Sequence, residues 1–401
     1  MKARSKISDY KGGHHVELLK SGEPFFETVE KVIDDARHFI HFQTYIIDED
    51  ETGRRIVNAL IRASKRGVRT YLLLDAFGTK YLSKEFVDSI EESGILFRFF
   101  SPTLTTKGFQ LSLRLHSKVV MADGEVAIIG GMNFADRYHG IHGKKEWLDF
   151  AVLLKGPELI HILSILKKLW NKTFIPKEER SREMIHNPVF YKEDIKLRVR
   201  QNNWYRRKIE IRRSYRNAFK TARERIIIFA SYFLPGRNER KLLRNASMRG
   251  VDITIVLAAE SDAPMFERAT HFLYDFILEN RIKIYEYLPS NLHAKAAVVD
   301  GKWSTIGSYN MNHLSDYASI EINVDIMDEG FAGRFENIMH DIINKDCRQV
   351  TFEEHNRRRR WFSRLRGWFS YQMIRLLMRI TYQLTSRKKK HRPVSAVQKT
   401  I

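Results

Sequence analysis

The sequence contains a single cysteine, Cys347, among 401 residues. A disulfide framework is therefore excluded, and a reducing compartment fits the chain better than a secreted one. Cys347 lies next to Asp346, outside any cluster of reactive side chains, so we interpret it as incidental. Residues 1–10 are charged and have no apolar run, which predicts neither a signal peptide nor an N-terminal membrane anchor. Short repeats of the solenoid type are also missing.

Acidic side chains are scarce relative to basic ones: 48 Asp and Glu against 69 Lys and Arg give a formal net charge of +21. With 43% hydrophobic residues the chain can still build a sizeable core. Residues 177–225 hold 16 basic and 7 acidic side chains, and residues 351–401 hold 14 and 2, so the remainder is neutral. This excess implies an anionic partner, either nucleic acid or a lipid surface, and composition alone does not separate the two.

Two stretches of about 180 residues follow the same order of apolar patterns. In each, a strand-like run, FIHFQTYII from Phe39 or IIIFASYFLPG from Ile226, precedes a helical pattern, an Arg-Gly-Val turn and a further apolar strand. Strands that alternate with helices of 10–15 residues are typical of α/β folds. We therefore predict an α/β protein made of two duplicated lobes, each a mixed sheet flanked by helices.

The predicted boundaries follow from composition. The stretch after Pro176 is charged and poor in aliphatic residues, which predicts a connector between the lobes. We predict an N-terminal lobe over residues 1–175, a basic connector over 176–194, a C-terminal lobe over 195–350 and a basic tail over 351–401.

One motif of the form HxKx4Dx6GxxN occurs once in each half. Its members are His116, Lys118, Asp123, Gly130 and Asn133 in the first half, and His293, Lys295, Asp300, Gly307 and Asn310 in the second. In strand geometry, residues two apart lie on the same face, so each His and Lys should project together. The small residues near each Asn would let a ligand oxygen approach the backbone.

Two imidazoles, two ammonium groups and two carboxamides that converge on one spot suit a phosphodiester. Lys and Asn would neutralise the non-bridging oxygens, one imidazole would attack phosphorus, and the other would protonate the leaving oxygen. We include Asp123 and Asp300 with the motif's catalytic set, although Asp-Gly is also a hairpin signature and favours a turn role for both. Nearby lysines and the lack of cysteine ligands disfavour a metal, and no cofactor is expected.

A histidine nucleophile needs its second nitrogen held, usually by a carboxylate. Glu321 alternates with isoleucines in SIEINVDI and should point into the polar site. Asp149 occupies the corresponding place before the strand FAVLL. We predict that both orient histidines, the alternative being ordinary carboxylates at strand ends.

At these residues the sequence resembles the phospholipase D superfamily, and in particular the bacterial cardiolipin synthase branch without N-terminal transmembrane helices. The resemblance covers about residues 15–350 and includes the two motifs, SYFLPG, IYEYLPSNLHAK and GSYNMNHLS. It implies two lobes that face each other across one site. It also implies a covalent phosphatidyl-histidine formed from phosphatidylglycerol and then attacked by the headgroup hydroxyl of a second lipid, without a metal.

The resemblance further implies His116 as nucleophile and His293 as general acid, although the symmetry of the motif leaves this order open. Lys118, Asn133, Lys295, Ser308 and Asn310 would bind phosphate. The first motif has Gly131 where many members have serine, so hydroxyl assistance is expected only from Ser308. The second lipid, the oligomeric state and the balance of transfer against hydrolysis stay open.

The tail contains an amphipathic pattern. Apolar residues recur at intervals of three and four, at Phe362, Leu365, Phe369, Met373, Leu376, Leu377, Ile380 and Leu384. Arginines lie roughly opposite, and Trp361 and Trp368 flank the apolar arc. This predicts a basic helix in an anionic lipid interface, the alternative being a helix docked on the core with a solvated basic side.

The sequence thus predicts a peripheral enzyme on the cytoplasmic face of a bacterial membrane that makes cardiolipin from phosphatidylglycerol. A nuclease of the same superfamily, with the connector along a nucleic-acid backbone, is the first rival, and the aromatic tail disfavours it. A lipid-binding scaffold with a decayed site is the second, and the ten intact motif positions disfavour that.

Overall fold

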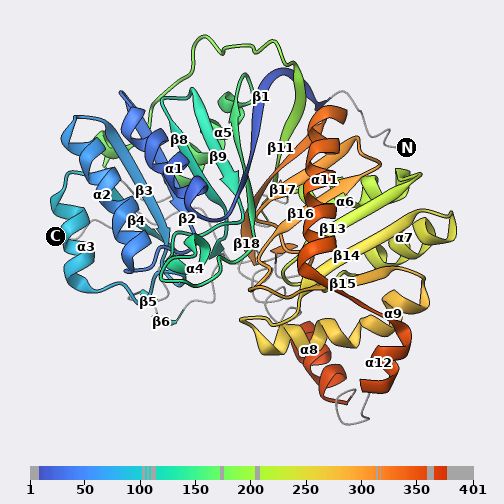
Figure 1. Cartoon of the computed structure of the whole chain (residues 1–401). Helices are drawn as coiled ribbons and strands as arrows, with labels where there is room; N and C mark the ends of the chain where they lie inside the picture. The colour runs from blue at the N-terminus through green and yellow to red at the C-terminus, as the bar shows by residue number, and fades with distance from the viewer. Residues whose placement is uncertain are drawn as a thin grey trace, which may run out of the picture.

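The structure is a computed structural model of the whole chain. It describes residues 9–101, 104–105, 108–109, 114–171, 176–203, 208–312, 315–316, 318–358 and 365–376. Figure 1 shows two lobes side by side, with the N-terminal lobe in blue to green and the C-terminal lobe in yellow to orange. Each lobe is a twisted mixed sheet with helices on its faces, which confirms the predicted fold class.

The sheet of the N-terminal lobe has the order β4-β3-β2-β8-β9-β10-β1, in which β2, β3 and β4 are parallel and the other neighbours antiparallel. Its strands are β1 (Lys11–Lys20), β2 (Phe39–Thr44), β3 (Arg69–Asp75), β4 (Leu96–Phe100), β8 (Lys118–Ala122), β9 (Val126–Gly130) and β10 (Phe150–Lys155). Its helices are α1 (Glu23–Asp35), α2 (Glu51–Lys65), α3 (Lys84–Glu92), α4 (Asp136–His139) and α5 (Leu159–Trp170). The short strands β5 (Leu104–Thr105) and β6 (Gly108–Phe109) form a separate pair.

The C-terminal lobe repeats this order as β19-β15-β14-β13-β16-β17-β18-β11. Its strands are β11 (Ile195–Asn203), β12 (Lys208–Ile209), β13 (Arg225–Ala230), β14 (Asp252–Ala258), β15 (Lys283–Tyr287), β16 (Lys295–Val299), β17 (Trp303–Gly307), β18 (Ser319–Met327) and β19 (Cys347–Val350). Its helices are α6 (Glu210–Thr221), α7 (Arg237–Met248), α8 (Pro264–Phe272), α9 (Tyr274–Glu279), α11 (Glu329–Asp346) and α12 (Phe352–Arg358). The crossovers α2 and α7, which each join two parallel strands, are therefore equivalent.

The lobes are joined by backbone pairing as well as by side chains. Strand β1 pairs with β10 of its own lobe and with β11 of the other. The short strand β7 (Arg114–Leu115) runs parallel to the start of β18, and a second parallel bridge joins Leu148 to Leu292. Both crossings lie directly before a motif histidine, so the junction of the lobes and the site are built from the same segments.

The apolar core has three parts. One lies under the outer helices of each lobe, and the third is continuous between the lobes and includes α5 and α11. There the Phe150 ring packs at 5.1 Å from Phe335 and at 6.2 Å from Phe229, centroid to centroid. Because this shared core spans both sheets, it fixes the lobes against each other and limits their freedom to hinge.

The segment 176–194 is folded onto the N-terminal lobe. Tyr71 Oη donates to Glu183 at 2.5 Å, and Trp170 Nε1 donates to the carbonyl of Glu179 at 2.9 Å. The segment holds four Lys or Arg against five Asp or Glu, so the expectation of a basic connector is wrong for these residues. The positive charge counted over 177–225 lies mainly after residue 194, where twelve of the sixteen basic side chains stand, seven of them in β11 and α6.

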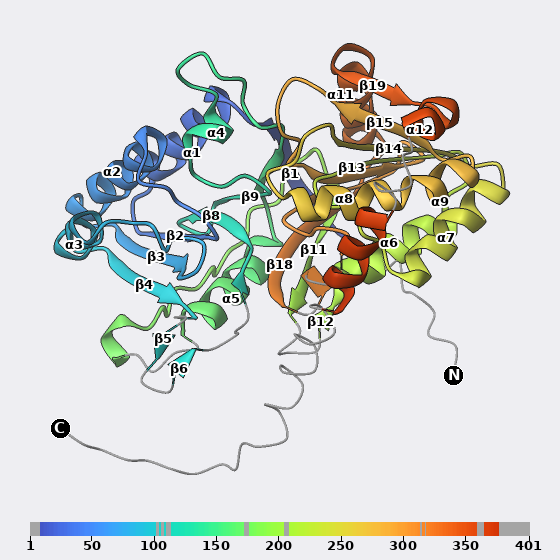
Figure 2. The same ribbon diagram turned by 90° about the horizontal axis from the view of Figure 1, so that it is seen from below.

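Two parts of the tail are described. Residues 351–358 include α12, and residues 365–376 form a second helix that lies beside α8 and α6, as the red helix without a label in Figure 2 shows. Its Tyr371 ring packs on Phe272 at 5.3 Å, and Ile374 is buried in the core of the C-terminal lobe. Residues 359–364 and 377–401, including several of the predicted apolar arc, lie outside the described residues. Within the described part of the chain no helix is long and apolar enough to cross a membrane.

Candidate active site at the lobe junction

The two motif histidines are each held by a carboxylate from the opposite lobe. His116 Nδ1 lies 2.9 Å from Oε2 of Glu321, and His293 Nδ1 lies 2.6 Å from Oδ2 of Asp149. Both carboxylates are fully buried, at the lobe-junction ends of β18 and β10. With Nδ1 occupied in this way, Nε2 of each imidazole is left to act on a substrate.

Backbone hydrogen bonds also connect each motif histidine to the opposite lobe. His116 N donates to the carbonyl of Ile320 at 3.0 Å, and His293 N donates to the carbonyl of Leu148 at 2.8 Å. Ile320 and Leu148 directly precede the two carboxylate residues. Each histidine is therefore fixed at its backbone and at its ring by the same strand of the other lobe, which gives the site a pseudo-twofold arrangement.

Both motif lysines lie beside the histidine of their own strand. Lys118 Nζ donates to the carbonyl of His116 at 2.7 Å, and Lys295 Nζ lies 3.0 Å from His293 Nδ1 and 4.0 Å from Asp149 Oδ2. Burial lowers the pKa of Lys118 to about 7 and that of Lys295 to about 8. The ammonium groups are thus poised to gain stability from an anionic phosphate placed between them.

Burial also perturbs the acids and the imidazoles. It raises the pKa of Asp149 to about 7, against the attraction of Lys295. Burial opposes ionisation of Glu321 too, but His116, Lys118 and the Ser308 hydroxyl outweigh it and leave the pKa of Glu321 below its ordinary value. Perturbed groups gathered in one place are typical of reaction centres.

The imidazoles themselves favour the neutral form. Burial, followed by the charges of Lys295, Lys118 and His116, lowers the pKa of His293 well below its ordinary value. Burial lowers the pKa of His116 as well, although Glu321 opposes the shift. The two rings are therefore close enough to influence each other's charge, and a neutral imidazole is the form that can attack phosphorus.

The two halves hold their carboxylates differently. Ser308 Oγ donates to Glu321 at 2.5 Å, and Ser319 Oγ donates to its other oxygen at 2.7 Å. In the first half Gly131 has no such hydroxyl, and the carboxylate of Asp149 instead accepts from the amide N–H of Phe150 at 2.8 Å. The expected hydroxyl assistance from Ser308 thus reaches the carboxylate that orients His116.

The motif Asp residues lie at the far ends of their strands from the histidines. Asp123 accepts three backbone N–H groups of residues 37–39, each at 2.8 Å, and Asp300 accepts those of residues 223–225 at 2.9 Å. Both adopt positive φ, 54° in each case, at the turn of a hairpin. This geometry favours the turn role over the catalytic one for both residues, because each carboxylate joins its hairpin to the start of a neighbouring strand.

The two motif glycines, Gly130 and Gly307, are packed against an adjacent strand. A Cβ on Gly130 would lie 2.4 Å from the Cβ of Ala151, and one on Gly307 would lie 2.3 Å from the carbonyl oxygen of Ile322. The expectation that small residues here leave room for a ligand oxygen is therefore wrong for these two. They are small because the adjacent strand passes against them.

The motif asparagines differ in their partners. Asn133 Nδ2 donates to Tyr138 Oη at 2.8 Å, and its oxygen accepts from the amide of Ile46 at 3.3 Å. The buried Oδ1 of Asn310 has no hydrogen-bond partner among the described residues. This oxygen can accept a hydrogen bond from a substrate hydroxyl, whereas a contact with a phosphate oxygen would have to come from the Nδ2 amide group of Asn310.

Aromatic walls flank both imidazoles, and sequence reasoning assigned them no role. The Tyr45 ring lies 4.9 Å from His116 and 5.3 Å from Lys118 Nζ, while Tyr138 meets His293 edge-on at 5.1 Å. Trp147 lies 6.2 Å from His293. The available signals were the position of Tyr45 at the end of a strand and that of Trp147 two residues before Asp149. These rings keep water from the imidazoles, which strengthens the electrostatic interactions within the site.

Among the described residues, no three His, Cys, Asp or Glu side chains are grouped as metal ligands would be. The site is instead two imidazoles and two ammonium groups around one point, between duplicated α/β lobes. That combination is the one expected of a phospholipase D-type enzyme.

Comparison with known proteins agrees with this class. The family model described as "Cardiolipin synthase, PLD-like domain" matches residues 29–170 and 215–343. The chain therefore belongs to this cardiolipin synthase family and is a phospholipase D-type phosphatidyltransferase. It is 31% identical over 378 residues to cardiolipin synthase B of Escherichia coli K12, covering 91% of this chain and 89% of that one.

A cardiolipin synthase of Geobacillus is 29% identical over 76% of this chain and 61% of its own length. Among solved structures, phosphatidylserine synthase of Haemophilus influenzae superposes with a TM-score of 0.69, covering 92% of this chain and 94% of that one. At 14% sequence identity this second likeness supports the fold alone.

Proposed function

We propose that this protein is a cardiolipin synthase that transfers a phosphatidyl group from one phosphatidylglycerol to the headgroup hydroxyl of another and releases glycerol. The observation that carries the proposal is the crossed pair of His–carboxylate contacts, 2.9 Å at His116 and 2.6 Å at His293, beside two buried lysines. The names of the relatives supply the substrate class, and the site supplies the chemistry.

In the proposed first step, Nε2 of His116 attacks phosphorus and the bond from phosphorus to the glycerol oxygen breaks. His293 gives its proton to that oxygen, so glycerol leaves neutral and a phosphatidyl-histidine remains. In the second step His293 takes the proton of the acceptor hydroxyl, whose oxygen attacks phosphorus and releases His116. Lys118, Lys295, Asn310 and Asn133 are the proposed phosphate ligands.

Two features support this order of roles. The His116 side chain is 17% exposed against 6% for His293, so it is the more accessible to a lipid phosphate. Its partner Glu321 is held ionised by surrounding donors, which fixes the proton on Nδ1 and leaves the Nε2 lone pair free. The negative charge of the phosphodiester would raise the pKa of His293 and let it carry the proton that it donates.

We also propose that the enzyme acts as a peripheral protein on the cytoplasmic face of the membrane. The exposed apolar residues of the tail helix, Leu365, Trp368, Phe369 and Leu376, support contact with an anionic lipid surface. The folded, charge-balanced segment 176–194 offers no basic track for a nucleic-acid backbone, which favours lipid over the nuclease alternative.

The test is to incubate the full-length protein with detergent-dispersed phosphatidylglycerol and, separately, with single-stranded DNA. We expect cardiolipin and glycerol by lipid mass spectrometry, intact DNA, and loss of activity by several orders of magnitude in His116→Ala and His293→Ala. Phosphatidic acid as the sole product would make the enzyme a hydrolase, and DNA cleavage would make it a nuclease.

The roles of the two histidines are tested by trapping. His293→Ala should accumulate the phosphatidyl adduct on His116 when a phosphatidyl donor with an activated leaving group is supplied, because such a group leaves without a proton. Peptide mass spectrometry locates the adduct. An adduct on His293 in the His116→Ala variant, with none on His116 in the His293→Ala variant, would reverse the assignment.

A further inference from the structure

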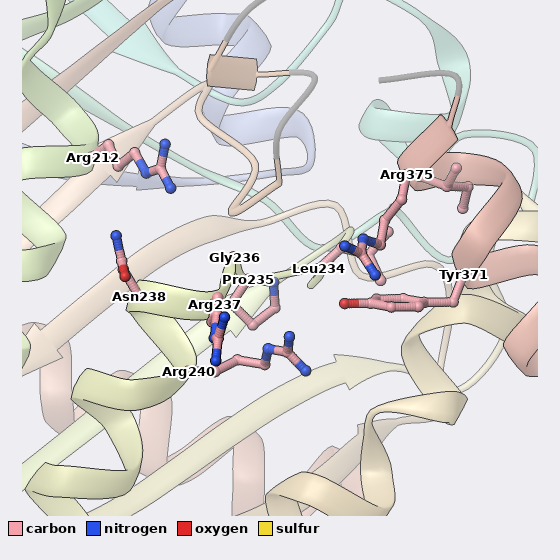
Figure 3. Close-up of a pocket in the computed structure, with 10 residues that line it drawn as sticks. Arg212, Leu234, Pro235, Gly236, Arg237, Asn238, Arg240, Tyr371 and Arg375 are labelled. Atoms are coloured by element: carbon pink, nitrogen blue, oxygen red, sulfur yellow. The ribbon is translucent and has the colours of Figure 1, made fainter. Parts of the chain in front are cut away.

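A cavity of about 280 Å³ lies in the C-terminal lobe, apart from the two histidines. It is enclosed by the start of α7, by the loop that precedes it and by the tail helix 365–376. Four arginines line it: Arg212, Arg237, Arg240 and Arg375. Figure 3 shows Tyr371 and Arg375 extending from the tail helix toward Arg237 and Arg240 at the start of α7.

Most of this positive charge is not neutralised by carboxylates in the part of the chain that the structure describes. Arg212 is paired with Glu239 at 2.8 Å and with Asp316 at 3.2 Å. Arg237, Arg240 and Arg375 form no salt bridge with a carboxylate among the described residues. The Nε atom of Arg240 is buried and has no hydrogen-bond partner in the same part of the chain. Buried donors without a partner are costly, so a ligand that accepts from them is favoured.

The backbone adds to this preference for an anion. Helix α7 begins after Gly236 and has no side-chain cap, while the acidic residue of its first turn, Glu239, is turned away to Arg212 and to Arg216 at 2.5 Å. The N–H groups at the start of α7 therefore retain their positive partial charge.

The equivalent helix of the N-terminal lobe is built in the opposite way. Asp50 caps α2 by accepting from the amide of Gly53 at 2.9 Å, and Asp136 accepts from the amide of Thr52 at 2.9 Å. Two carboxylates thus occupy in the first lobe the place that arginines surround in the second. The start of α2 is therefore covered by carboxylates of the protein itself, whereas the start of α7 has basic neighbours and no such cap, which is what binding of an external anion requires.

The position of the cavity indicates where that anion comes from. The tail helix that closes the cavity with Tyr371, Ile374 and Arg375 exposes Trp368 and Phe369 on its surface, at 46% and 56%. Aromatic and aliphatic side chains of this kind lie at the depth of lipid headgroups when a helix rests on a bilayer. A phosphate held under the helix would then belong to a lipid whose acyl chains lie beside these residues.

We propose that this cavity is a second phosphate site, separate from the reacting centre, that holds the headgroup of an anionic phospholipid and thereby docks the C-terminal lobe on the membrane. Its ligands would be Arg237, Arg240 and Arg375 with the free N–H groups of α7. The inference rests on the proposed function in one respect, because it takes the phosphatidylglycerol of the substrate membrane as the lipid.

The test compares two double variants of the full-length protein that remove the same charge from the same helix. Arg237→Gln/Arg240→Gln alters the cavity. Lys241→Gln/Arg244→Gln alters two exposed residues of α7 outside it. Sedimentation is measured with phosphatidylcholine vesicles that contain phosphatidylglycerol, and with phosphatidylcholine vesicles alone. We expect the cavity variant to lose about tenfold more affinity for the anionic vesicles than the control variant does.

Arg375→Gln, which approaches the cavity from the tail helix, should lose affinity in the same direction with an unchanged thermal unfolding midpoint. Equal losses in the two double variants would show diffuse surface charge and overturn the proposal. If calorimetry shows that inorganic phosphate binds the wild type but not Arg237→Gln/Arg240→Gln, while their vesicle affinities are equal, the site takes free phosphate and the lipid assignment is wrong.

Failure of this inference is distinguishable from failure of the proposed function. Formation of cardiolipin by the wild type in detergent tests the function alone. Equal vesicle binding by the two double variants, in a protein that makes cardiolipin, would reject the second site alone.

Discussion

The carboxylate of Asp149 lies against Gly131 in the space that a side chain would fill. A Cβ atom on Gly131 would lie 2.5 Å from both carboxylate oxygens. In the other half Ser308 holds the equivalent position and donates to Glu321, whose side chain is one methylene longer. The glycine in the first motif is therefore matched to a shorter, closer carboxylate, and the two histidines are oriented by different means.

Gly131→Ser should displace Asp149 and lower kcat about 10- to 100-fold with little change in KM, since residues that orient a reacting group have effects of that size. Steady-state kinetics on detergent-dispersed phosphatidylglycerol measures this. Gly333→Ser is the matched control, because nothing lies within 4 Å of a Cβ there. Wild-type kcat in Gly131→Ser would show that the position of Asp149 is not critical.

Asp149→Asn and Glu321→Gln should each lower kcat by about 10²- to 10⁴-fold, because an amide no longer fixes the tautomer or stabilises the imidazolium. The crossed contacts add a sharper expectation. If His116 is the nucleophile, Glu321→Gln should slow adduct formation with an activated donor, whereas Asp149→Asn should affect it much less. Single-turnover measurement of the adduct separates the two. Equal slowing by both variants would contradict the assigned roles.

Asp123→Asn tests the turn role of the motif aspartate. The amide would place an N–H₂ group against one of the backbone N–H groups of residues 37–39, and it loses the charge that strengthens the other contacts. We expect the free energy of unfolding to fall by about 1–3 kcal/mol. Activity per folded molecule should stay at the wild-type level. A large loss of kcat with unchanged stability would return Asp123 to the catalytic set.

The pH dependence should show an alkaline limb from the lysines. With pKa values near 7 for Lys118 and near 8 for Lys295, both ammonium groups lose protons as the pH rises through this range. The charge that stabilises the phosphodiester is then lost, so kcat/KM should fall as the pH rises above about 7. Arginine keeps its proton, so Lys118→Arg/Lys295→Arg, which replaces both titrating groups, should move this limb to higher pH. A profile that stays flat to pH 10 would contradict the assignment.

The pKa shifts also make the free energy of unfolding depend on pH, and the lysines and Asp149 change it in opposite directions. For each lysine the folded protein binds fewer protons than the unfolded chain between the lowered pKa and the ordinary value near 10.5, so stability should rise with pH in that window. The raised pKa of Asp149 does the reverse between about pH 4 and 7.

The duplication and the alternation of strands and helices along each lobe were predictable, because buried strands and amphipathic helices leave local periodicities in the sequence. Asp149 and Glu321 could also be selected, since Asp149 precedes an apolar strand and Glu321 alternates with isoleucines within one. Their crossing could not, because Asp149 is 144 residues from His293 and Glu321 is 205 residues from His116 in the chain. Periodicity shows which face a side chain occupies, whereas the docking of two lobes decides which residue it meets.

The roles of the motif glycines and of the tail could also be predicted only in part from the sequence. A small residue is required equally by a ligand and by a neighbouring strand, and only the structure shows that Ala151 and Ile322 approach Gly130 and Gly307. The tail pattern identified an apolar arc but not the surface that docks. Gly367 allows close approach to α8, where its Cβ would lie 3.1 Å from the carbonyl oxygen of Arg268.

The tail helix therefore has two apolar sides with separable roles. Tyr371 and Ile374 face the C-terminal lobe, while Trp368 and Phe369 are exposed. Trp368→Ser/Phe369→Ser should weaken binding to phosphatidylglycerol-containing vesicles and leave the thermal midpoint unchanged, because only the contact with lipid is lost. Ile374→Ala should lower the free energy of unfolding of the lobe by about 2–5 kcal/mol, because it leaves a cavity in the core.

Vesicle sedimentation and thermal unfolding of the full-length variants measure both effects. The opposite pattern, with Trp368→Ser/Phe369→Ser destabilising the fold and binding vesicles normally, would show that the exposed side is covered by protein and that the membrane contact lies elsewhere. This comparison is sharper than deletion of residues 351–401, because deletion would uncover the surface under Tyr371 and Ile374 and confuse loss of membrane binding with loss of stability.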